Sequence, residues 1–405
     1  MKNKHNLLFS EITFISPRDV RKNRSDVVHI MRTCSGFVKN GMKVMLLTPR
    51  VQREGNIQSK KEVKSYYALD STFFKLIESD YCIKENHLGE TSFVKLVLLK
   101  LFLTFKHFLG NRNDYKSKNH IIISKCIISC VPIILLKKIN LISSPLTLEL
   151  IHAKKSFLYG FVVRHADFII SHSPFVTYYL SNFLKKAPHR IVQPPMITQS
   201  KEFKEHIKLQ KEDYKELLGF CSNQRLVMYA GKVFVGSKEI QYIYEAAKQL
   251  PDIRFAIVGA SPTAMRYYEE YFKGVRNITL YPFQSIHKYY EFVKSADILI
   301  AYYPRSNHYM YHLDPGKIGV YLASGNPVIL SDLIGLRLRF KEWMVKFVPP
   351  DDVSQLVASI QTILSDYDRF SRDAERTRLY VESFDYEYYT ACVLRDINKC
   401  IAQWD

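Results

Sequence analysis

The chain lacks the short signatures of several large enzyme classes. Its 405 residues contain no GxGxxG after a predicted strand, no GxxxxGK followed by Ser or Thr, no HExxH and no GxSxG. Their absence argues against dinucleotide-dependent oxidoreductases, P-loop enzymes and α/β-hydrolases. Glycine and proline are scarce, at 15 and 16 residues, and this scarcity excludes collagen-like and low-complexity classes.

Metal-binding and secretion signals are also missing. Seven cysteines are present, but none forms a CxxC pair, and Cys126 and Cys130 have no second pair downstream. A zinc site is therefore not expected, and the pattern favours free thiols in a reducing cytoplasm. The single DxD, Asp366 to Asp368, follows a helical pattern and is interpreted as a solvated helix end. The first residues, MKNKHNLLFSEITF, lack the apolar core and cleavage site of a signal peptide.

Acidic residues are few relative to basic ones. The chain has 58 Lys and Arg against 39 Asp and Glu, a formal net charge of +19. Such a balance indicates an anionic partner, which could be a phosphorylated substrate, an anionic membrane surface or a nucleic acid. The length predicts two or three domains with sizeable cores.

No hydrophobic run is both long and uncharged enough to span a membrane. The stretch 92–109 contains three lysines and predicts an amphipathic helix. Its apolar half carries Val94, Val97, Leu98, Leu101, Phe102, Phe105, Phe108 and Leu109. This half either packs on the protein core or lies on a membrane surface. The stretch 121–136 is too short to span and predicts a strand that runs into a buried helix.

Short apolar runs alternate with longer amphipathic segments along the chain. The expected strands are 7–10, 43–48, 120–124, 146–151, 168–172, 190–193, 226–230, 254–258, 278–281, 298–302, 327–330 and 345–348. They are rich in Ile, Val and Leu without polar alternation, which is typical of parallel strands buried on both faces. The alternation predicts an α/β protein with right-handed crossovers.

A break near Pro194 and Pro195 divides this pattern. It predicts two doubly wound Rossmann-like domains, at residues 1–195 and 223–380, joined by a linker at 196–222. Residues 381–405 predict a helix that packs back across the domain join. Because doubly wound sheets bind ligands at the carboxyl ends of their strands, the default site is the cleft between the two domains.

Two loops in the second half carry the strongest chemical signal. In the first, the strand at 226–230 runs into a turn with Gly231 and Gly236, and a helix begins near Ser237. Lys232 and Lys238 flank this turn. A glycine turn that leads into a helix N-terminus offers N–H groups to an anion, and the lysines add charge. The alternative is an ordinary strand–turn–helix with surface lysines.

The second loop reads LDPGKIGVYLASGNPVI from Leu313. Asp314 and Pro315 predict a helix N-cap and first helical residue, followed by Gly316. Lys317 then lies in the first turn, where a cation is unfavourable unless an anion shares the helix end. The alternative is a short connecting helix.

Together these loops resemble GT-B glycosyltransferases, in particular the large retaining family called family 4, to which bacterial group 1 glycosyltransferases belong. YAGK with a lysine at the next helix is similar to the family's diphosphate-binding turn. PGKIGVYLASGNPVILSD is similar to the segment that contacts donor sugar and phosphate. The likeness is strongest in residues 225–332 and weaker in the N-terminal half. It implies a GT-B fold, with the two Rossmann-like domains facing each other across a cleft.

The resemblance also implies roles for individual residues. The donor diphosphate would be bound by Gly231, Lys232, Lys238, Pro315, Gly316 and Lys317. The donor sugar and ribose would lie near His312, Asp314, Val320 and Tyr321, and the base near Pro282 and Phe283. His152 is the candidate catalytic residue, since the family often has an E-x-H at this strand end, and here Glu149 precedes it with one extra residue of spacing. The alternative is a histidine that bonds backbone at a strand end. Asp26 and His29 form the candidate acceptor-side loop.

The sequence departs from the family at two glutamate positions and in the opening loop, where Ser25 and Asp26 stand in place of the usual double glycine. A glutamate that hydrogen-bonds the donor ribose is replaced by Val320, and a second glutamate near the sugar is replaced by His312. These losses leave open a catalytically inactive GT-B protein that acts as a binding or membrane-associated partner. Two further alternatives are a nucleic-acid binder, suggested by charge alone, and a GT-B-shaped sugar-nucleotide epimerase.

The expected function is therefore a glycosyltransferase that moves a sugar from a nucleotide-sugar to a glycan acceptor, lipid-linked in our interpretation. It would serve bacterial surface polysaccharide synthesis, such as capsule or O-antigen, with retention of configuration. The resemblance implies no metal and no cofactor, because the lysines stabilise the leaving diphosphate. We expect a cytoplasmic protein, peripheral on the inner face of the plasma membrane, with no nucleic-acid partner.

Overall fold

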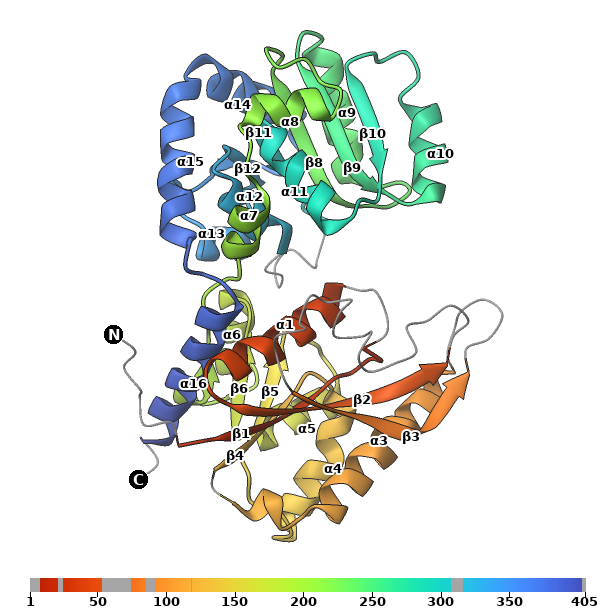
Figure 1. The fold of residues 1–405 in the computed structure, drawn as a ribbon, viewed down its shortest axis with the longest axis vertical. Helices are drawn as coiled ribbons and strands as arrows, with labels where there is room; N and C mark the ends of the chain where they lie inside the picture. Colours follow the sequence, from red (N-terminus) through yellow and green to blue (C-terminus); the bar gives the residue numbers. More distant parts are fainter. Residues whose placement is uncertain are drawn as a thin grey trace. The chain divides into compact units, whose positions relative to one another are not determined.

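The protein folds into two compact α/β units. The computed structural model describes residues 8–20, 25–52, 74–84, 92–117, 119–306 and 316–402. Unit 1 comprises Met1–Pro195 and Tyr386–Asp405, and unit 2 comprises Met196–Asp385. Each unit is built on one parallel sheet (Figure 1). The predicted class, α/β with two Rossmann-like units, is confirmed.

Unit 1 has a seven-stranded sheet in the order β3-β2-β1-β4-β5-β6-β7. Its strands are β1 (Glu11–Ile15), β2 (Lys43–Gln52), β3 (Lys75–Lys84), β4 (His120–Ser124), β5 (Leu146–Leu150), β6 (Phe168–Ser171) and β7 (Ile191–Val192). Its helices are α1 (Ser25–Lys39), α3 (Phe93–Gly110), α4 (Ile127–Lys138), α5 (Phe157–His165), α6 (Pro174–Asn182) and α16 (Tyr386–Ile401). Helices α1 and α16 pack together, and α3 and α4 lie on the opposite face of the sheet (Figure 1).

Unit 2 has a six-stranded sheet in the order β10-β9-β8-β11-β12-β13. Its strands are β8 (Leu226–Val233), β9 (Arg254–Ala260), β10 (Ile278–Pro282), β11 (Ile298–Ala301), β12 (Val328–Ser331) and β13 (Lys346–Val348). Its helices are α7 (Ser200–His206), α8 (Lys211–Leu217), α9 (Lys238–Gln249), α10 (Pro262–Tyr271), α11 (Ile286–Ser295), α12 (Gly316–Ser324), α13 (Ile334–Arg339), α14 (Val353–Ser365) and α15 (Tyr367–Val381). The segment 196–222, predicted as a linker, forms α7 and α8 within this unit.

Two strand predictions fail in unit 1. The first strand runs over Glu11–Ile15 and not over 7–10, and β3 was not predicted. Strand β1 is buried although it contains Thr13, because Thr13 Oγ1 lies 2.8 Å from Tyr115 Oη and 2.9 Å from His120 Nε2. A buried hydroxyl is tolerated only where such partners exist, and they lie about a hundred residues away in the chain.

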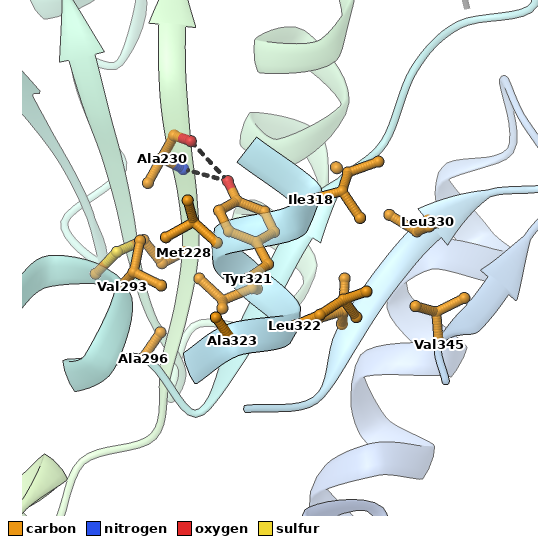
Figure 2. Packing of buried hydrophobic residues seen from close by; sticks show 14 of the residues in the cluster. Met228, Ala230, Val293, Ala296, Ile318, Tyr321, Leu322, Ala323, Leu330 and Val345 are labelled. Atoms are coloured by element: carbon orange, nitrogen blue, oxygen red, sulfur yellow. Dashed lines mark hydrogen bonds between the residues drawn. The ribbon is translucent and has the colours of Figure 1, made fainter. Parts of the chain in front are cut away.

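The core of unit 2 fixes the position of helix α12. Ile318, Tyr321 and Leu322 lie in a buried apolar cluster between this helix and the sheet (Figure 2), and Val320 belongs to the same cluster. The Tyr321 hydroxyl donates to the Ala230 carbonyl oxygen and accepts from the Ala230 amide, both at 2.8 Å. This pair of bonds ties α12 to β8 one residue before Gly231.

Helix α3 is oriented in a way that contradicts one of our two predictions. Its buried side chains are Leu99, Thr104 and Phe108, so polar Thr104 faces inward. Much of the apolar half predicted to pack on the core, including Val94, Leu98 and Phe102, is exposed instead. Among the described residues, no helix has the length and apolar character needed to cross a bilayer.

Candidate functional site

The predicted donor residues of unit 2 lie where the order of the sheet reverses. Strand β8 lies at the centre, with β9 on one side and β11 on the other. Ligands of doubly wound sheets bind at such a switch point, at the carboxyl ends of the strands. Tyr229 belongs to β8, Tyr303 follows β11, and Lys317 belongs to α12, which follows β11.

Strand β8 approaches its neighbour closely at Gly231. The pairing of β8 with β9 shifts register between Ala230 and Val233, so Gly231 and Lys232 lie in a bulge within the strand, which ends at Val233 and not at residue 230 as predicted. Gly259 on β9 has φ of +114°, and a Cβ there would lie 2.1 Å from the Gly231 carbonyl oxygen. A Cβ on Gly231 itself would lie 3.2 Å from Lys317 Nζ. Only glycine at position 259 allows the two strands to approach this closely, whereas a side chain at position 231 would displace Lys317.

Lys317 is held against two aromatic rings. Its Nζ donates to Tyr229 Oη at 2.9 Å and lies 4.0 Å from the centroid of that ring. The centroid of the Tyr303 ring is 4.9 Å away. These distances are within the range of cation–π attraction. The lysine is thus fixed beside Gly231 by aromatic side chains.

The charge of Lys317 is not balanced by a directly bonded carboxylate. Among the described residues, no carboxylate forms an ion pair with Nζ; Glu239 Oε2 lies 3.2 Å from the intervening Tyr229 hydroxyl. Burial lowers the pKa of Lys317 to about 8, and the Glu239 carboxylate acts in the opposite direction. The Tyr303 hydroxyl is buried and has no hydrogen-bond partner within the described ranges. An anion at this point would stabilise the charged lysine.

The other predicted donor residues have varied placements. Lys232 and Lys238 are exposed, and Lys238 opens helix α9 as expected. Pro282 ends β10, and the exposed Phe283 follows it, with its amide bonded to the Ala260 carbonyl at 3.0 Å. Gly316 is the first residue of α12, whereas His312, Asp314 and Pro315 lie outside the described residues.

Two predicted contacts with sugar or ribose fall on core residues. Val320 is only 2% exposed and packs in the apolar cluster of unit 2. The Tyr321 side chain is fully buried, and its hydroxyl is occupied by the Ala230 backbone. Neither side chain is therefore exposed for a ligand, and Tyr321 instead bonds β8 next to Gly231.

In unit 1, ionisable side chains meet at the carboxyl edge of the sheet around Glu149. Three groups contact Glu149 Oε1: His172 Nε2 at 2.6 Å, Lys125 Nζ at 2.8 Å and His29 Nε2 at 3.0 Å. Tyr389 of α16 lies 3.2 Å from His172 Nε2. The Glu149 side chain is 1% exposed, and its second carboxylate oxygen has no hydrogen-bond partner in the described part of the chain. We call these five residues the Glu149 cluster.

The electrostatics of the Glu149 cluster favour a neutral arrangement. The pKa of Glu149 lies well below its usual range. Burial alone would raise this pKa, but the Lys125 charge and the two histidine hydrogen bonds together lower it by more. The pKa of His29 falls to about 4, because burial and the Lys125 charge oppose its protonation. His29, Glu149 and His172 bring ligand atoms within 4.8 Å of one another, as a metal site would require. Lys125, however, already neutralises the carboxylate.

Sequence reasoning found only part of this cluster. It singled out Glu149 and His29, but not Lys125, His172 or Tyr389. The signal available was that Lys125 directly follows β4 and His172 directly follows β6, so both lie at the same sheet edge as Glu149. His152, the predicted catalytic residue, follows β5 and is half-buried, and its carbonyl oxygen accepts from Tyr159 Oη at 3.2 Å. Asp26 Oδ2 lies 2.6 Å from Arg18 Nε.

Comparisons with known proteins agree with the predicted family resemblance. Residues 224–366 match the family described as Glycosyl transferases group 1. No curated protein sequence matches the chain. Among solved structures, sucrose-phosphate synthase from Thermosynechococcus elongatus is similar over 97% of this chain and 100% of its own, with TM-score 0.69 and 16% identity.

Two further structures show the same fold. Anabaena HepE in complex with UDP-glucose matches 97% of this chain and 99% of its own, with TM-score 0.62 and 12% identity. WaaG, a glycosyltransferase involved in lipopolysaccharide biosynthesis, matches 95% of this chain and 98% of its own, with TM-score 0.62 and 15% identity. The fold is GT-B, and the predicted resemblance to group 1 glycosyltransferases is confirmed.

Proposed function

We propose that this chain, in which residues 224–366 form a group 1 glycosyl transferase domain on a GT-B fold, transfers a sugar from a nucleotide-sugar to a glycan acceptor. The observation that carries the proposal is the position of Lys317 at the switch point of unit 2. It lies beside Gly231 with no directly paired carboxylate in the described residues. A cation held in this way binds the diphosphate of a donor and stabilises its charge as the glycosidic bond breaks.

The surrounding residues supply the rest of a donor site. Lys232 and Lys238 add exposed positive charge, and the N-terminus of α9 adds N–H groups that favour an anion. The exposed ring of Phe283, at the end of β10, is available to stack on a nucleobase. In this proposal the three lysines stabilise the negative charge of the leaving diphosphate, so the reaction needs no metal ion.

The acceptor binds unit 1 at the carboxyl edge of its sheet. His152 follows β5 there and orients or deprotonates the acceptor hydroxyl, with Asp26 and His29 at the start of α1 beside the acceptor. We propose a lipid-linked glycan of bacterial surface polysaccharide synthesis, such as capsule or O-antigen, as acceptor. The net charge of +19 supports a phosphorylated acceptor at an anionic inner leaflet. Retention of configuration follows from the family resemblance.

A second candidate is an inactive GT-B protein that acts as a binding partner. Val320 supports it, because a valine buried in the core replaces the glutamate that would bind the donor ribose. Under this alternative, donor binding would be weak or absent and no sugar would be transferred.

A transfer assay separates these possibilities. The full chain would be incubated with a panel of nucleotide-sugars and a bacterial lipid extract, and release of nucleoside diphosphate and labelled lipid would be measured. We expect labelled lipid with one donor, a loss of at least about a hundredfold in the Lys232→Ala/Lys317→Ala variant, and no change with a chelator. Incubation with donor alone tests for an epimerase, which would isomerise the sugar. Donor binding without any transfer or isomerisation would favour the inactive protein.

A further inference from the structure

Helix α3 exposes a continuous apolar face. Phe93, Val94, Leu98, Phe102 and Phe105 are 76%, 64%, 59%, 47% and 45% exposed, respectively. Val94, Leu98, Phe102 and Phe105 recur at a spacing of four, four and three residues, so they line one side of the helix. We call these five residues the α3 face. Contiguous apolar surface of this kind marks an interaction site in soluble proteins.

The orientation of α3 is fixed from its inner side by polar contacts. His107 Nε2 lies 2.7 Å from Tyr115 Oη, and Tyr115 Oη in turn lies 2.8 Å from Thr13 Oγ1 on β1. Thr104 is fully buried and donates to the Lys100 carbonyl at 2.7 Å. The Thr104 bond lies within the helix, so the bond between His107 and Tyr115 is the one that rotating the helix to bury the α3 face would break. The exposure is therefore built into the fold.

The charge on helix α3 and on the two helices that follow it in the chain is positive. Lys95 and Lys106 are exposed on the same helix, and α3 contains no acidic residue. Helices α4 and α5, packed next in order on this side of the sheet, also contain none (Figure 1). By contrast, α9, α10 and α15 of unit 2 each carry two or more acidic residues. This combination of apolar stripe and lysines complements an anionic bilayer surface.

The start of α5, near the proposed acceptor side, also combines exposed apolar and basic residues. Phe157 is 84% exposed, and Lys154 and Lys155 precede it on the surface. These residues follow His152 closely in the chain, at the carboxyl edge where β5 ends. A bilayer that contacts unit 1 here would bring a lipid-linked acceptor to the proposed acceptor side.

We propose that the α3 face docks on an anionic lipid bilayer, with α3 lying in the interface and its lysines on the headgroups. The docking would place unit 1 next to a lipid-linked acceptor, and this link to the acceptor rests on the proposed function. The contact itself does not require the donor site. The two can therefore fail separately, because vesicle binding is measured without any nucleotide.

Vesicle co-sedimentation of the full chain tests the docking. Vesicles of phosphatidylcholine with half phosphatidylglycerol should bind the protein at least about tenfold more tightly than pure phosphatidylcholine vesicles. The Leu98→Ser/Phe102→Ser variant should bind at least about tenfold more weakly than wild type. Lys95→Glu/Lys106→Glu should weaken binding by about fivefold or more per lysine, the equivalent of about 1 kcal/mol each. The matched control is Leu217→Ser/Leu338→Ser, which changes exposed leucines of unit 2 and should bind as wild type.

A Phe102→Trp variant reads the contact directly, since brominated lipids should quench the introduced indole on vesicle addition. No binding of the wild type, unchanged binding of the α3 variant, or an indole that is not quenched would overturn the proposal. A concentration-dependent dimer that the Leu98→Ser/Phe102→Ser variant abolishes, without vesicle binding, would assign the α3 face to a second copy of the chain.

Discussion

Lys317 of unit 2 and Lys125 of unit 1 both lie at the carboxyl edge of a parallel sheet, but they differ in what neutralises them. Lys125 Nζ is 2.8 Å from the buried Glu149 carboxylate. Lys317 Nζ contacts a tyrosine hydroxyl and two rings, and no described carboxylate pairs with it. A neutralised cation holds a fold together, whereas an unneutralised one is available for an anionic ligand. On this account Lys125 is structural, whereas Lys317 is available to bind the proposed donor.

The largest effect expected is on the Glu149 cluster. Glu149→Gln leaves the buried Lys125 charge unpaired and should destabilise unit 1 by about 3–5 kcal/mol, the usual cost of breaking a buried pair. The measurement is hydrogen exchange of β4 and β5 peptides as a function of urea. The control is Lys125→Met/Glu149→Gln, which should recover at least half of the loss. If Glu149→Gln alone is as stable as wild type, the cluster does not have the structural role assigned to it.

Removing the contact between Tyr321 and Ala230 should have a smaller effect. Tyr321→Phe deprives the buried Ala230 amide and carbonyl of their bonds to this hydroxyl. The expected loss is about 1–3 kcal/mol of stability in unit 2, with weaker nucleotide binding because the Gly231 turn loosens. Urea denaturation and calorimetric titration would measure the two quantities. Tyr303→Phe is the matched control, since the Tyr303 hydroxyl has no partner in the described residues, and it should leave stability nearly unchanged.

The two units should respond to pH in different ranges. His29 has a pKa lowered to about 4, so the unfolded chain binds more protons between about pH 4 and 6.5, and unit 1 gains stability as the pH rises through that range. Lys317 has a pKa lowered to about 8, so unit 2 gains stability from about pH 8 to 10.5 by the same argument. Nucleotide affinity should instead fall above pH 8, by up to about tenfold per pH unit, because the bound diphosphate needs the charged lysine.

Titrating nucleotide binding between pH 7 and 9.5 tests the Lys317 part. Two variants serve as controls. Lys317→Met should remove the pH dependence of unit 2 stability and of nucleotide affinity, and His29→Gln should remove only the pH dependence of unit 1 stability. An affinity that stays constant through pH 9.5 would mean that Lys317 does not contact the diphosphate.

The smallest change in stability is expected for Lys317→Met, which, unlike Glu149→Gln, should not destabilise its unit. Lys317→Met removes a charge that has no directly bonded carboxylate among the described residues and keeps the apolar stem against Tyr229 and Tyr303. It should therefore leave the stability of unit 2 unchanged or raise it by about 1 kcal/mol without ligand. Urea denaturation in the absence of nucleotide is the measurement. A loss of more than about 2 kcal/mol would mean that this lysine is structural, like Lys125.

The sequence predicted the parallel sheets well where strands are uniformly apolar. Strand β4 was predicted with its observed bounds, and β8 and β9 with their observed starts. It misplaced β1, whose buried Thr13 looks like a surface residue until Tyr115 and His120 are known to contact it. It left the orientation of α3 open, because the helical pattern does not show that His107 contacts Tyr115, which lies just after the helix.

The candidate sites show the same limit. The proposed donor segment could be proposed from the sequence because Gly231, Lys232 and Lys238 are close together in the chain. The Glu149 cluster could be predicted only in part, because its five members come from α1, α16 and the ends of three strands, and the folded sheet edge brings them together.

The most direct test of the central claim is thermal melting of the full chain against UDP, GDP, ADP, CMP and TDP, with wild type beside Lys317→Met. The account predicts that one nucleotide raises the wild-type melting temperature, since a ligand at 100 times its dissociation constant stabilises by about 2.7 kcal/mol, and that the variant does not respond. An equal rise in both proteins, or no rise with any nucleotide, would contradict the assignment of Lys317 as the cation that holds the donor diphosphate.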